Sequence, residues 1–192
     1  VVGRFLGADA LAAVGSSYTL MVFLTSVILG LCMGSGAAVS MDYGSGRADE
    51  MRRSIFLSFV LIAALSLLLN VLVYVFIDPI LALLRVPTDV IPLMKTYLLI
   101  IFAGIAATFL YNYCASVLRA IGNAVVPLLF LAVSAVLNVA LDLCFVIVLR
   151  LDVGGAAFAT VLAQFVSGIG ILLYTLLRFP DLRPKKDDCR CS

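Results

Sequence analysis

Apolar residues dominate five long stretches of the chain, and polar or helix-breaking residues separate these stretches. A helix needs about 20 predominantly apolar residues to cross the hydrocarbon core of a membrane. The pattern predicts spanning helices over residues 8–36, 50–77, 91–118, 124–149 and 154–178. Glycine and proline lie between the stretches, where a continuous helix would resist them. We therefore expect an all-α, polytopic membrane bundle, with a helical lobe over residues 1–178 and a polar cytoplasmic connector over residues 179–192.

Lysine and arginine are distributed unequally between the two ends of the predicted helices. One end carries Arg47, Arg52, Arg53, Arg119, Arg178, Arg183, Lys185, Lys186 and Arg190. The other end carries Arg4, Arg85, Lys95 and Arg150. Loops rich in these residues stay in the cytoplasm, so we expect the first end, together with the carboxyl end of the chain, to be cytoplasmic. The expected location is the cell inner (cytoplasmic) membrane, with several crossings and contact with membrane lipids.

Composition supports the membrane class and excludes several others. The chain is 64% apolar and 12% charged, whereas soluble domains average about 45 to 50% apolar and about 25% charged. A formal charge of +2 is too small to suggest a nucleic-acid partner. Histidine is absent, and no zinc-ligand spacing, phosphate-binding glycine loop or nucleophile elbow is present. We expect neither an enzyme nor a bound cofactor, and no metal ion other than Na+.

An acidic residue, Asp142, lies inside the otherwise apolar stretch 124–149. At the centre of a membrane helix an Asp costs roughly 2.5 to 3.5 kcal/mol, so such a residue is a candidate functional site. Ser134, Asn138 and Asp142 are spaced four apart and share one helix face. Since low dielectric disfavours a charged carboxyl, Asp142 is expected to bind a proton, or Na+ with the Asn138 carbonyl as a further oxygen ligand. The alternative is an interhelical hydrogen bond that only holds the bundle together.

Two further stretches carry polar side chains on one helix face. They are Thr108, Tyr111 and Asn112 in residues 91–118, and Thr160, Gln164 and Ser167 in residues 154–178. Lipid cannot satisfy such groups, so they must face other helices or water. We expect them to form, with Ser134, a partly polar chamber around Asp142.

Other polar and small residues are expected to serve helix packing. Ser66, Asn70, Tyr74 and Asp78 form a stripe in the second stretch, and such groups commonly join membrane helices. Asp78 is expected to mark the water interface. Gly30, Gly34 and Gly36 near the end of the first stretch predict close helix contact, because small residues let two backbones approach.

Several short segments occur in an order that is typical of one transporter family. They are residues 7–15, 34–36, 43–49 with Arg52 and Arg53, 119–123 with Pro127, 138–142 and 153–160. On these segments the chain resembles the multidrug and toxic compound extrusion (MATE) family of secondary transporters. The resemblance implies a parent with twelve helices in two lobes, of which this chain covers the second to sixth helices. The chain opens at Val1 without an initiator Met, so we expect a truncated protein whose first helix and carboxyl-terminal lobe are missing.

The resemblance also implies a function and a site. In the family, an Asp on the first helix commonly joins an Asn and an Asp on the fifth helix in binding protons or Na+. Only the latter two carry over to this chain, as Asn138 and Asp142, and Thr160 resembles a position that lines the same chamber. The implied activity is antiport, in which a small organic cation or drug is exported in exchange for H+ or Na+.

Two alternatives remain open at this stage. A lipid-linked saccharide flippase of the same superfamily would need a basic chamber for pyrophosphate, but no Lys or Arg lies near the middle of a predicted helix. A membrane scaffold without transport activity would use the polar stripes only to join helices. Replacing Asp142 with Asn separates the scaffold from the antiporter, because a near-isosteric amide preserves packing and removes ion coupling.

Overall fold

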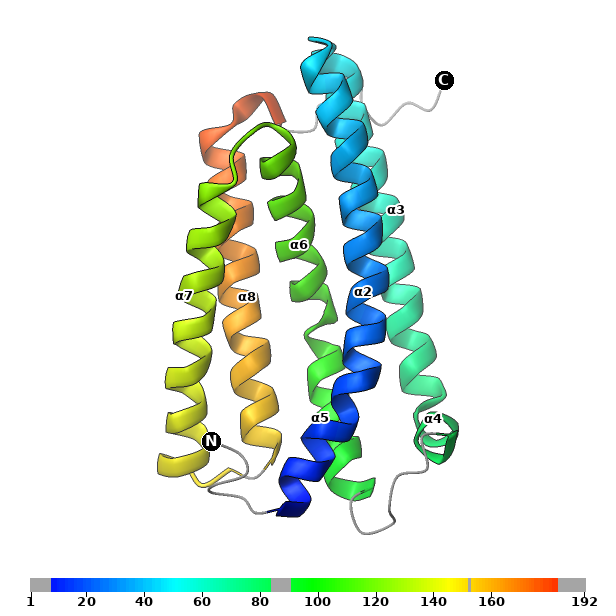
Figure 1. Ribbon diagram of the computed structural model, residues 1–192, viewed down its shortest axis with the longest axis vertical. Helices are drawn as coiled ribbons and strands as arrows, with labels where there is room; N and C mark the ends of the chain where they lie inside the picture. Colours follow the sequence, from blue (N-terminus) through cyan, green and yellow to red (C-terminus); the bar gives the residue numbers. More distant parts are fainter. Residues whose placement is uncertain (1–7, 84–90, 152, 183–192) are drawn as a thin grey trace.

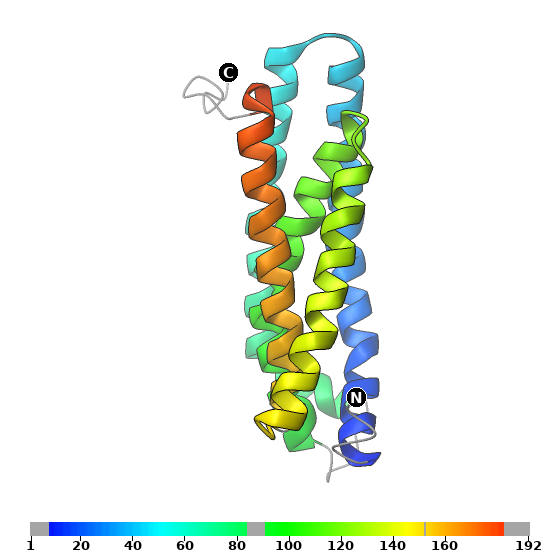
Figure 2. The ribbon, with the colours of Figure 1, turned by 90° about the vertical axis from the view of Figure 1, so that its left-hand side faces the viewer.

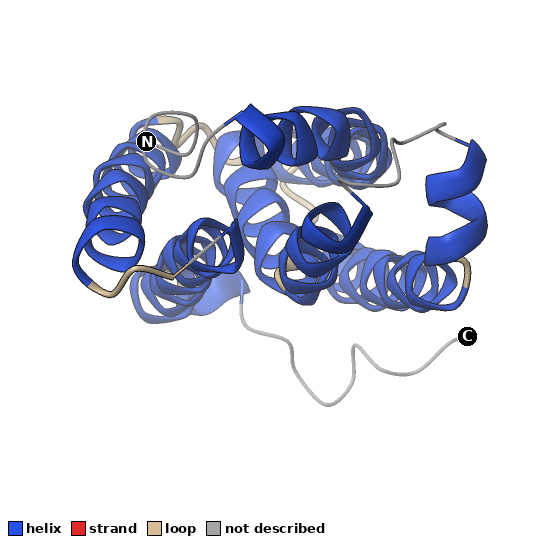
Figure 3. Ribbon diagram, turned by 90° about the horizontal axis from the view of Figure 1, so that it is seen from below, coloured by secondary structure: helices blue, strands red, loops and turns tan. Residues whose placement is uncertain are grey.

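A computed structural model describes residues 8–83, 91–151 and 153–182, and all of its regular elements are helical within these ranges (Figure 3). The elements are α2 (Ala8–Gly44), α3 (Ala48–Val75), α4 (Ile77–Leu83), α5 (Ile91–Ala103), α6 (Ile105–Ala120), α7 (Val125–Asp142), the π-helix η1 (Leu143–Val148), α8 (Val153–Arg178) and the short 3-10 helix η2 (Pro180–Leu182). The all-α class expected from the sequence is confirmed.

The long helices run roughly parallel to one axis of an elongated bundle (Figures 1 and 2). Helix α6 lies in the middle and packs against α2, α3, α7 and α8. Helices α2 and α3 lie on one side of it, and α7 and α8 on the other. Side chains of Ile28, Val39, Leu98, Phe102 and Phe109 fill the contact between α2, α5 and α6. The central position of α6 lets its two faces contribute to different sites.

Four described helices are long and apolar enough to cross a membrane, and α5 with α6, which are bent by 43° at their junction, make a fifth if the pair is counted as one span. The molecule is therefore a multi-pass membrane bundle. Its bounds differ from the predicted ranges in four main places. Helix α2 continues to Gly44, and α3 ends at Val75 with the separate helix α4 after it. The third span breaks at Gly104, and the fourth changes from α- to π-helix after Asp142. Hydropathy alone does not detect these changes, because apolar residues continue through the break and through the π-helix, whereas α2 extends into a segment that contains Ser40 and Asp42.

The break between α5 and α6 is stabilised by the polar stripe of α3. The Asn70 side-chain amide donates to the carbonyl of Phe102, and the Tyr74 hydroxyl donates to the carbonyl of Leu99 at 2.6 Å. Backbone carbonyls at a helix break need such partners in a membrane. At the end of this stripe, exposed Asp78 pairs with Lys95 at 2.6 Å. The interpretation of the stripe as a packing element is confirmed for Asn70 and Tyr74.

Close contact between α2 and α6 depends on Gly36. A Cβ atom at Gly36 would fall on the Ser116 hydroxyl, which donates at 2.7 Å to the carbonyl of Cys32. Gly30 and Gly34 face open space instead, so the prediction of close contact was wrong for these two glycines. Helix periodicity explains the difference: Gly36 and Cys32 share the face toward α6, whereas Gly30 and Gly34 point away from it.

The predicted connector begins with a docked segment. Phe179 and Leu182 pack on the hydrophobic core, and Leu182 is 6% exposed. Residues 183–192 lie outside the described part of the chain. The described start of the connector is thus an ordered cap over the Arg178 end of the bundle.

Candidate polar chamber and carboxylate site

The polar face of α7 is directed toward α8. The Ser134 hydroxyl donates to the carbonyl of Ala163 at 3.3 Å, and the Asn138 amide donates to the Thr160 hydroxyl at 3.1 Å. Thr160 in turn donates to the Ala156 carbonyl at 3.1 Å. The spacing of four residues on α7 therefore brings Ser134 and Asn138 to the same helix interface, and α8 supplies partners from successive turns.

A polar cavity of about 230 Å³ lies between α2, α6, α7 and α8. Its lining includes Thr25, Leu29, Thr108, Tyr111, Asn112, Leu131, Ser134, Gln164 and Ser167. Among the chamber residues expected from the sequence, Ser134, Thr108, Tyr111, Asn112 and Gln164 thus come together. Asn138, Thr160 and Asp142 do not line this cavity, so the expected single chamber around Asp142 is instead a cavity with a neighbouring carboxylate site.

Hydrogen bonds fix the orientation of the lining side chains. Thr108 donates to the side-chain carbonyl of Gln164 at 2.7 Å, and Asn112 donates to the backbone carbonyl of Thr108 at 2.7 Å. The Tyr111 hydroxyl donates to the carbonyl of Pro127 at 2.8 Å. The polar groups that remain are neutral hydroxyls and amides, and no Lys or Arg belongs to the described lining.

Thr25 of α2 also lines the cavity, although the spacing of polar residues in the sequence does not predict it. The first predicted helix has isolated polar residues but no stripe as regular as Ser134, Asn138 and Asp142. The spacing of Thr25 and Leu29 on one face becomes informative only when the neighbours of α2 are known. Ser167 shares the Gln164 face of α8, lines the cavity and donates to the carbonyl of Phe130 at 3.1 Å.

Asp142 is the last residue of α7, and the π-helix η1 follows it directly. Its Oδ1 atom is buried and accepts no hydrogen bond from any described residue. π-helical turns are rare and frequently occur at functional sites. Asp142 is therefore a half-buried side chain with one buried acceptor atom, at a point where the helix geometry changes.

The chemistry of this site suits a proton or a hard monovalent cation. Asn138 uses its amide nitrogen toward Thr160, which leaves its carbonyl oxygen as an acceptor one helical turn from Asp142. Hard cations prefer such oxygen ligands. The described residues contain no cluster of three or more His, Cys, Asp or Glu side chains suited to a metal ion. One carboxylate and neutral oxygens cannot provide the dense acidic cage of a tight divalent site.

Comparison with known proteins connects this geometry to a family. The MatE family model matches residues 1–144, which include Asn138 and Asp142. This chain belongs to the MatE family. The resemblance inferred from the sequence segments is therefore confirmed.

The MatE chain has named relatives among bacterial proteins. It is 36% identical over 175 residues to "Probable multidrug resistance protein YpnP" of Bacillus subtilis, covering 91% of this chain and 39% of the relative. It is 28% identical over 170 residues to "FAD transporter" of Shewanella oneidensis, covering 84% of this chain and 37% of that protein. This chain thus spans about two fifths of the length of these relatives, and both are named for resistance or transport rather than for catalysis.

Solved structures share the fold of the MatE chain. The "Vibrio cholerae MATE transporter VcmN in the bent form" is 27% identical with a TM-score of 0.89, covering 98% of this chain and 43% of that one. Another structure, described as "MATE in the bent conformation", has a TM-score of 0.93 at 24% identity and covers 100% of this chain and 43% of its own. At this identity the second likeness supports the fold alone. The described bundle thus has the architecture found in part of a MATE transporter.

Proposed function

We propose that the chain forms most of the amino-terminal lobe of a secondary antiporter. In this proposal the complete protein exports organic cations or drugs across the cytoplasmic membrane in exchange for H+ or Na+. Asp142 and Asn138 bind the coupling ion, and the polar cavity beside them takes part in substrate binding or hydration. The first helix and a second lobe complete the transporter.

The observation that carries the proposal is the buried Oδ1 atom of Asp142, which lacks a hydrogen-bond donor among the described residues. An acidic oxygen inside a membrane bundle is costly unless a partner compensates it. A proton or cation supplies that partner without any change in the fold. The neutral cavity is lined on α7 by Ser134, two helical turns from Asp142, so in this proposal it serves substrate binding or hydration and not the ion site itself.

Ion binding can change the bundle through the α7–α8 interface. A bound proton removes the charge of Asp142, and with it the attraction for a cation or for water. The neighbouring Asn138–Thr160 hydrogen bond links this change to α8. A ligand shifts a conformational equilibrium only as far as it binds the two states with different affinity. Here the two states are the inward-open and outward-open arrangements of the lobes.

The test is the substitution Asp142→Asn in the complete polypeptide, assayed by export of a cationic dye from cells or vesicles under an imposed pH or Na+ gradient. We expect gradient-driven export to be abolished while the amount of protein in the membrane stays normal, because the amide keeps the shape and loses the ionisable group. Export that responds to the gradient as in the parent would falsify the role of Asp142.

Asp78→Asn is the matched control. It removes the same charge from an exposed carboxylate that pairs with Lys95. We expect this variant to export the dye normally. Comparing the pH gradient with the Na+ gradient in the parent then identifies the coupling ion.

The cavity chemistry disfavours an anionic substrate. A flippase for pyrophosphate-linked lipids, or a carrier for an anionic nucleotide cofactor, needs basic groups beside the bound phosphates. The described cavity lining has none, and the nearest ionisable group on α7 is acidic. A scaffold without transport activity is the remaining alternative, and it predicts that neither the parent nor Asp142→Asn exports the dye.

A further inference from the structure

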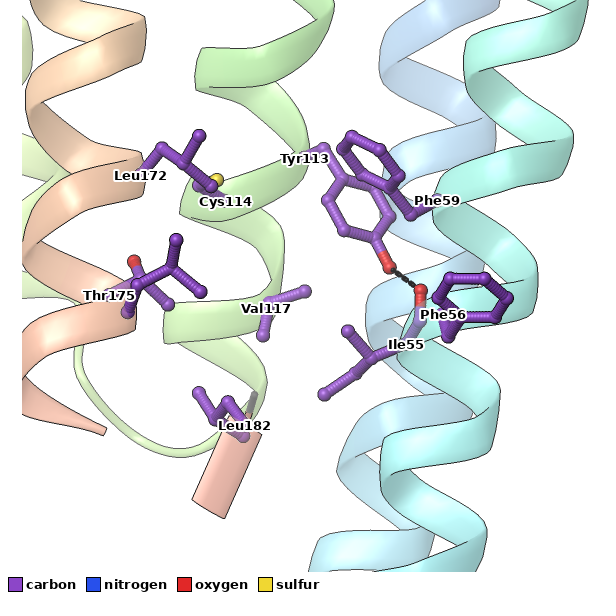
Figure 4. Close-up of a pocket in the computed structure, with 10 residues that line it drawn as sticks. Ile55, Phe56, Phe59, Tyr113, Cys114, Val117, Leu172, Thr175 and Leu182 are labelled. Carbon is purple, nitrogen blue, oxygen red and sulfur yellow. Dashed lines mark hydrogen bonds between the residues drawn. The ribbon is translucent and has the colours of Figure 1, made fainter. Parts of the chain in front are cut away.

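A second cavity lies on the other face of α6, away from the polar chamber. Its volume is about 260 Å³, and α3, α6, α8 and η2 border it. Figure 4 shows Ile55 of α3, Val117 of α6 and Leu172 of α8 around one space, with Leu182 of η2 at one end (Figure 4). Helices α3 and α8 each pack on α6, and the cavity lies between them.

The lining of this cavity has almost no polar group to offer a ligand. Its two hydroxyls are already used, since Tyr113 donates to the carbonyl of Ile55 at 2.5 Å and Thr175 donates to that of Ile171 at 2.7 Å. The volume is below the roughly 300 to 1,000 Å³ of sites for drug-sized molecules. A flexible hydrocarbon chain fits both the chemistry and the size of this space.

Two arginines flank the same end of the cavity. Arg53 precedes the lining residue Phe56 by one helical turn of α3, and Arg178 follows the lining residue Thr175 by one turn of α8. Residues three apart are neighbours on a helix surface. Neither arginine forms an ion pair with another described residue, whereas Arg52 pairs with Asp49.

The acidic residues at the end of α2 and the start of α3 are compensated by other cations. Asp42 and Glu50 both pair with Arg47. Arg53 and Arg178, each one turn from the lining, are therefore positive charges that no acidic side chain of the described residues neutralises in an ion pair. This charge repels an organic cation and attracts an anionic group.

We propose that this cavity is a binding site for an anionic phospholipid. One acyl chain occupies the space between α3, α6 and α8, and the headgroup phosphate contacts Arg53 and Arg178. Basic pockets between membrane helices on the cytoplasmic side bind anionic headgroups by this combination. The inference requires the membrane setting but not transport activity, so it can fail or hold independently of the proposed antiport.

Tryptophan fluorescence tests this proposal, because the 192 residues contain no tryptophan. Phe56→Trp places a reporter in the cavity lining, and Leu57→Trp places one on α3 at the same depth, where the side chain is 41% exposed. Any tryptophan elsewhere in a longer polypeptide is first replaced by Phe. The protein is reconstituted into phosphatidylcholine vesicles with increasing fractions of brominated phosphatidylglycerol or brominated phosphatidylcholine, which quench tryptophan on contact.

We expect the Phe56→Trp reporter to be quenched at a lower mole fraction of the anionic lipid than of phosphatidylcholine, by about fivefold for each contributing arginine. The Leu57→Trp reporter is expected to respond equally to both lipids. Arg53→Gln with Arg178→Gln should abolish the preference, whereas Arg119→Gln at the same end of α6 should leave it intact. Equal quenching of Phe56→Trp by both lipids, absence of quenching, or a preference that survives the double variant overturns the proposal.

Discussion

Substitution of Gly36 with Ala offers a direct test of the packing between α2 and α6. The added methyl group falls on the Ser116 hydroxyl and lies 3.4 Å from its backbone oxygen. The hydroxyl must rotate away, so its hydrogen bond to Cys32 is lost. Hydrogen bonds between membrane helices average about 0.6 kcal/mol, with a maximum of about 1.7. Overpacking of a well-packed core typically costs a further 1 to 3 kcal/mol.

Helix propensity acts in the opposite direction. Ala favours a helix over Gly by about 1 kcal/mol in soluble hosts, so the expected net loss of unfolding free energy is about 1 to 3 kcal/mol. Equilibrium unfolding of the purified protein in mixed detergent micelles measures this loss. Gly34→Ala is the matched control, because no atom lies within 4 Å of a Cβ at that position, and it should be neutral or stabilising.

A second substitution isolates the cause. Ser116→Ala removes the hydroxyl with which the new methyl group collides, so the double variant Gly36→Ala, Ser116→Ala should be more stable than Gly36→Ala alone. Coupling between contacting residues is commonly 0.5 to 3 kcal/mol. Additive effects of the two substitutions, or a stability of Gly36→Ala equal to that of the Gly34→Ala control, would refute the packing argument.

Two other polar contacts give further predictions. Asn70→Leu leaves the Phe102 carbonyl beside the helix break without its donor, which should lower the unfolding free energy by about 1 to 3 kcal/mol. Tyr74 is exposed, so Tyr74→Phe should lower the unfolding free energy by less than Asn70→Leu does. An equal decrease in the two variants would contradict this ranking. Lys95→Gln removes an exposed ion pair with Asp78, so it should lower the free energy of unfolding by only about 0.2 to 1 kcal/mol. This change should disappear in high salt.

The sequence predicts the class and the spans because membrane solvation imposes strong constraints on composition and length. It does not predict the break at Gly104, where the chain packs too closely against another helix for a larger residue to fit without a shift. A Cβ at Gly104 would approach Val161 of α8 to 2.8 Å and the carbonyl of Ile101 to 3.0 Å. Residue periodicity describes one helix at a time, whereas this contact depends on how α5, α6 and α8 are placed together.

The residue types that line the polar cavity could be predicted from the sequence, but the extent of the cavity could not. Polar groups inside a membrane must face protein or water, so the stripes of α6, α7 and α8 identify Thr108, Ser134 and Gln164. Their axial heights depend on helix tilt and on the break in the third span, which spacing does not encode. Asp142 is consequently beside the cavity that these residues line rather than at its centre.

The hydrogen-bond partners separate two kinds of polar residue in this bundle. Ser35 donates to Ser58 at 2.8 Å, Ser116 donates to the carbonyl of Cys32, and Asn70 donates to the carbonyl of Phe102. Each of these hydrogen bonds joins two helices and offsets the desolvation of the polar group. Asp142 is different, because its buried Oδ1 has no donor in the described structure. An ionisable side chain costs more free energy in lipid than a hydroxyl or an amide. If Asp142 only joined helices, a hydrogen-bond donor for its carboxylate would therefore be expected. The described contacts leave Oδ1 without a donor, and a proton or cation bound as proposed would supply the missing partner.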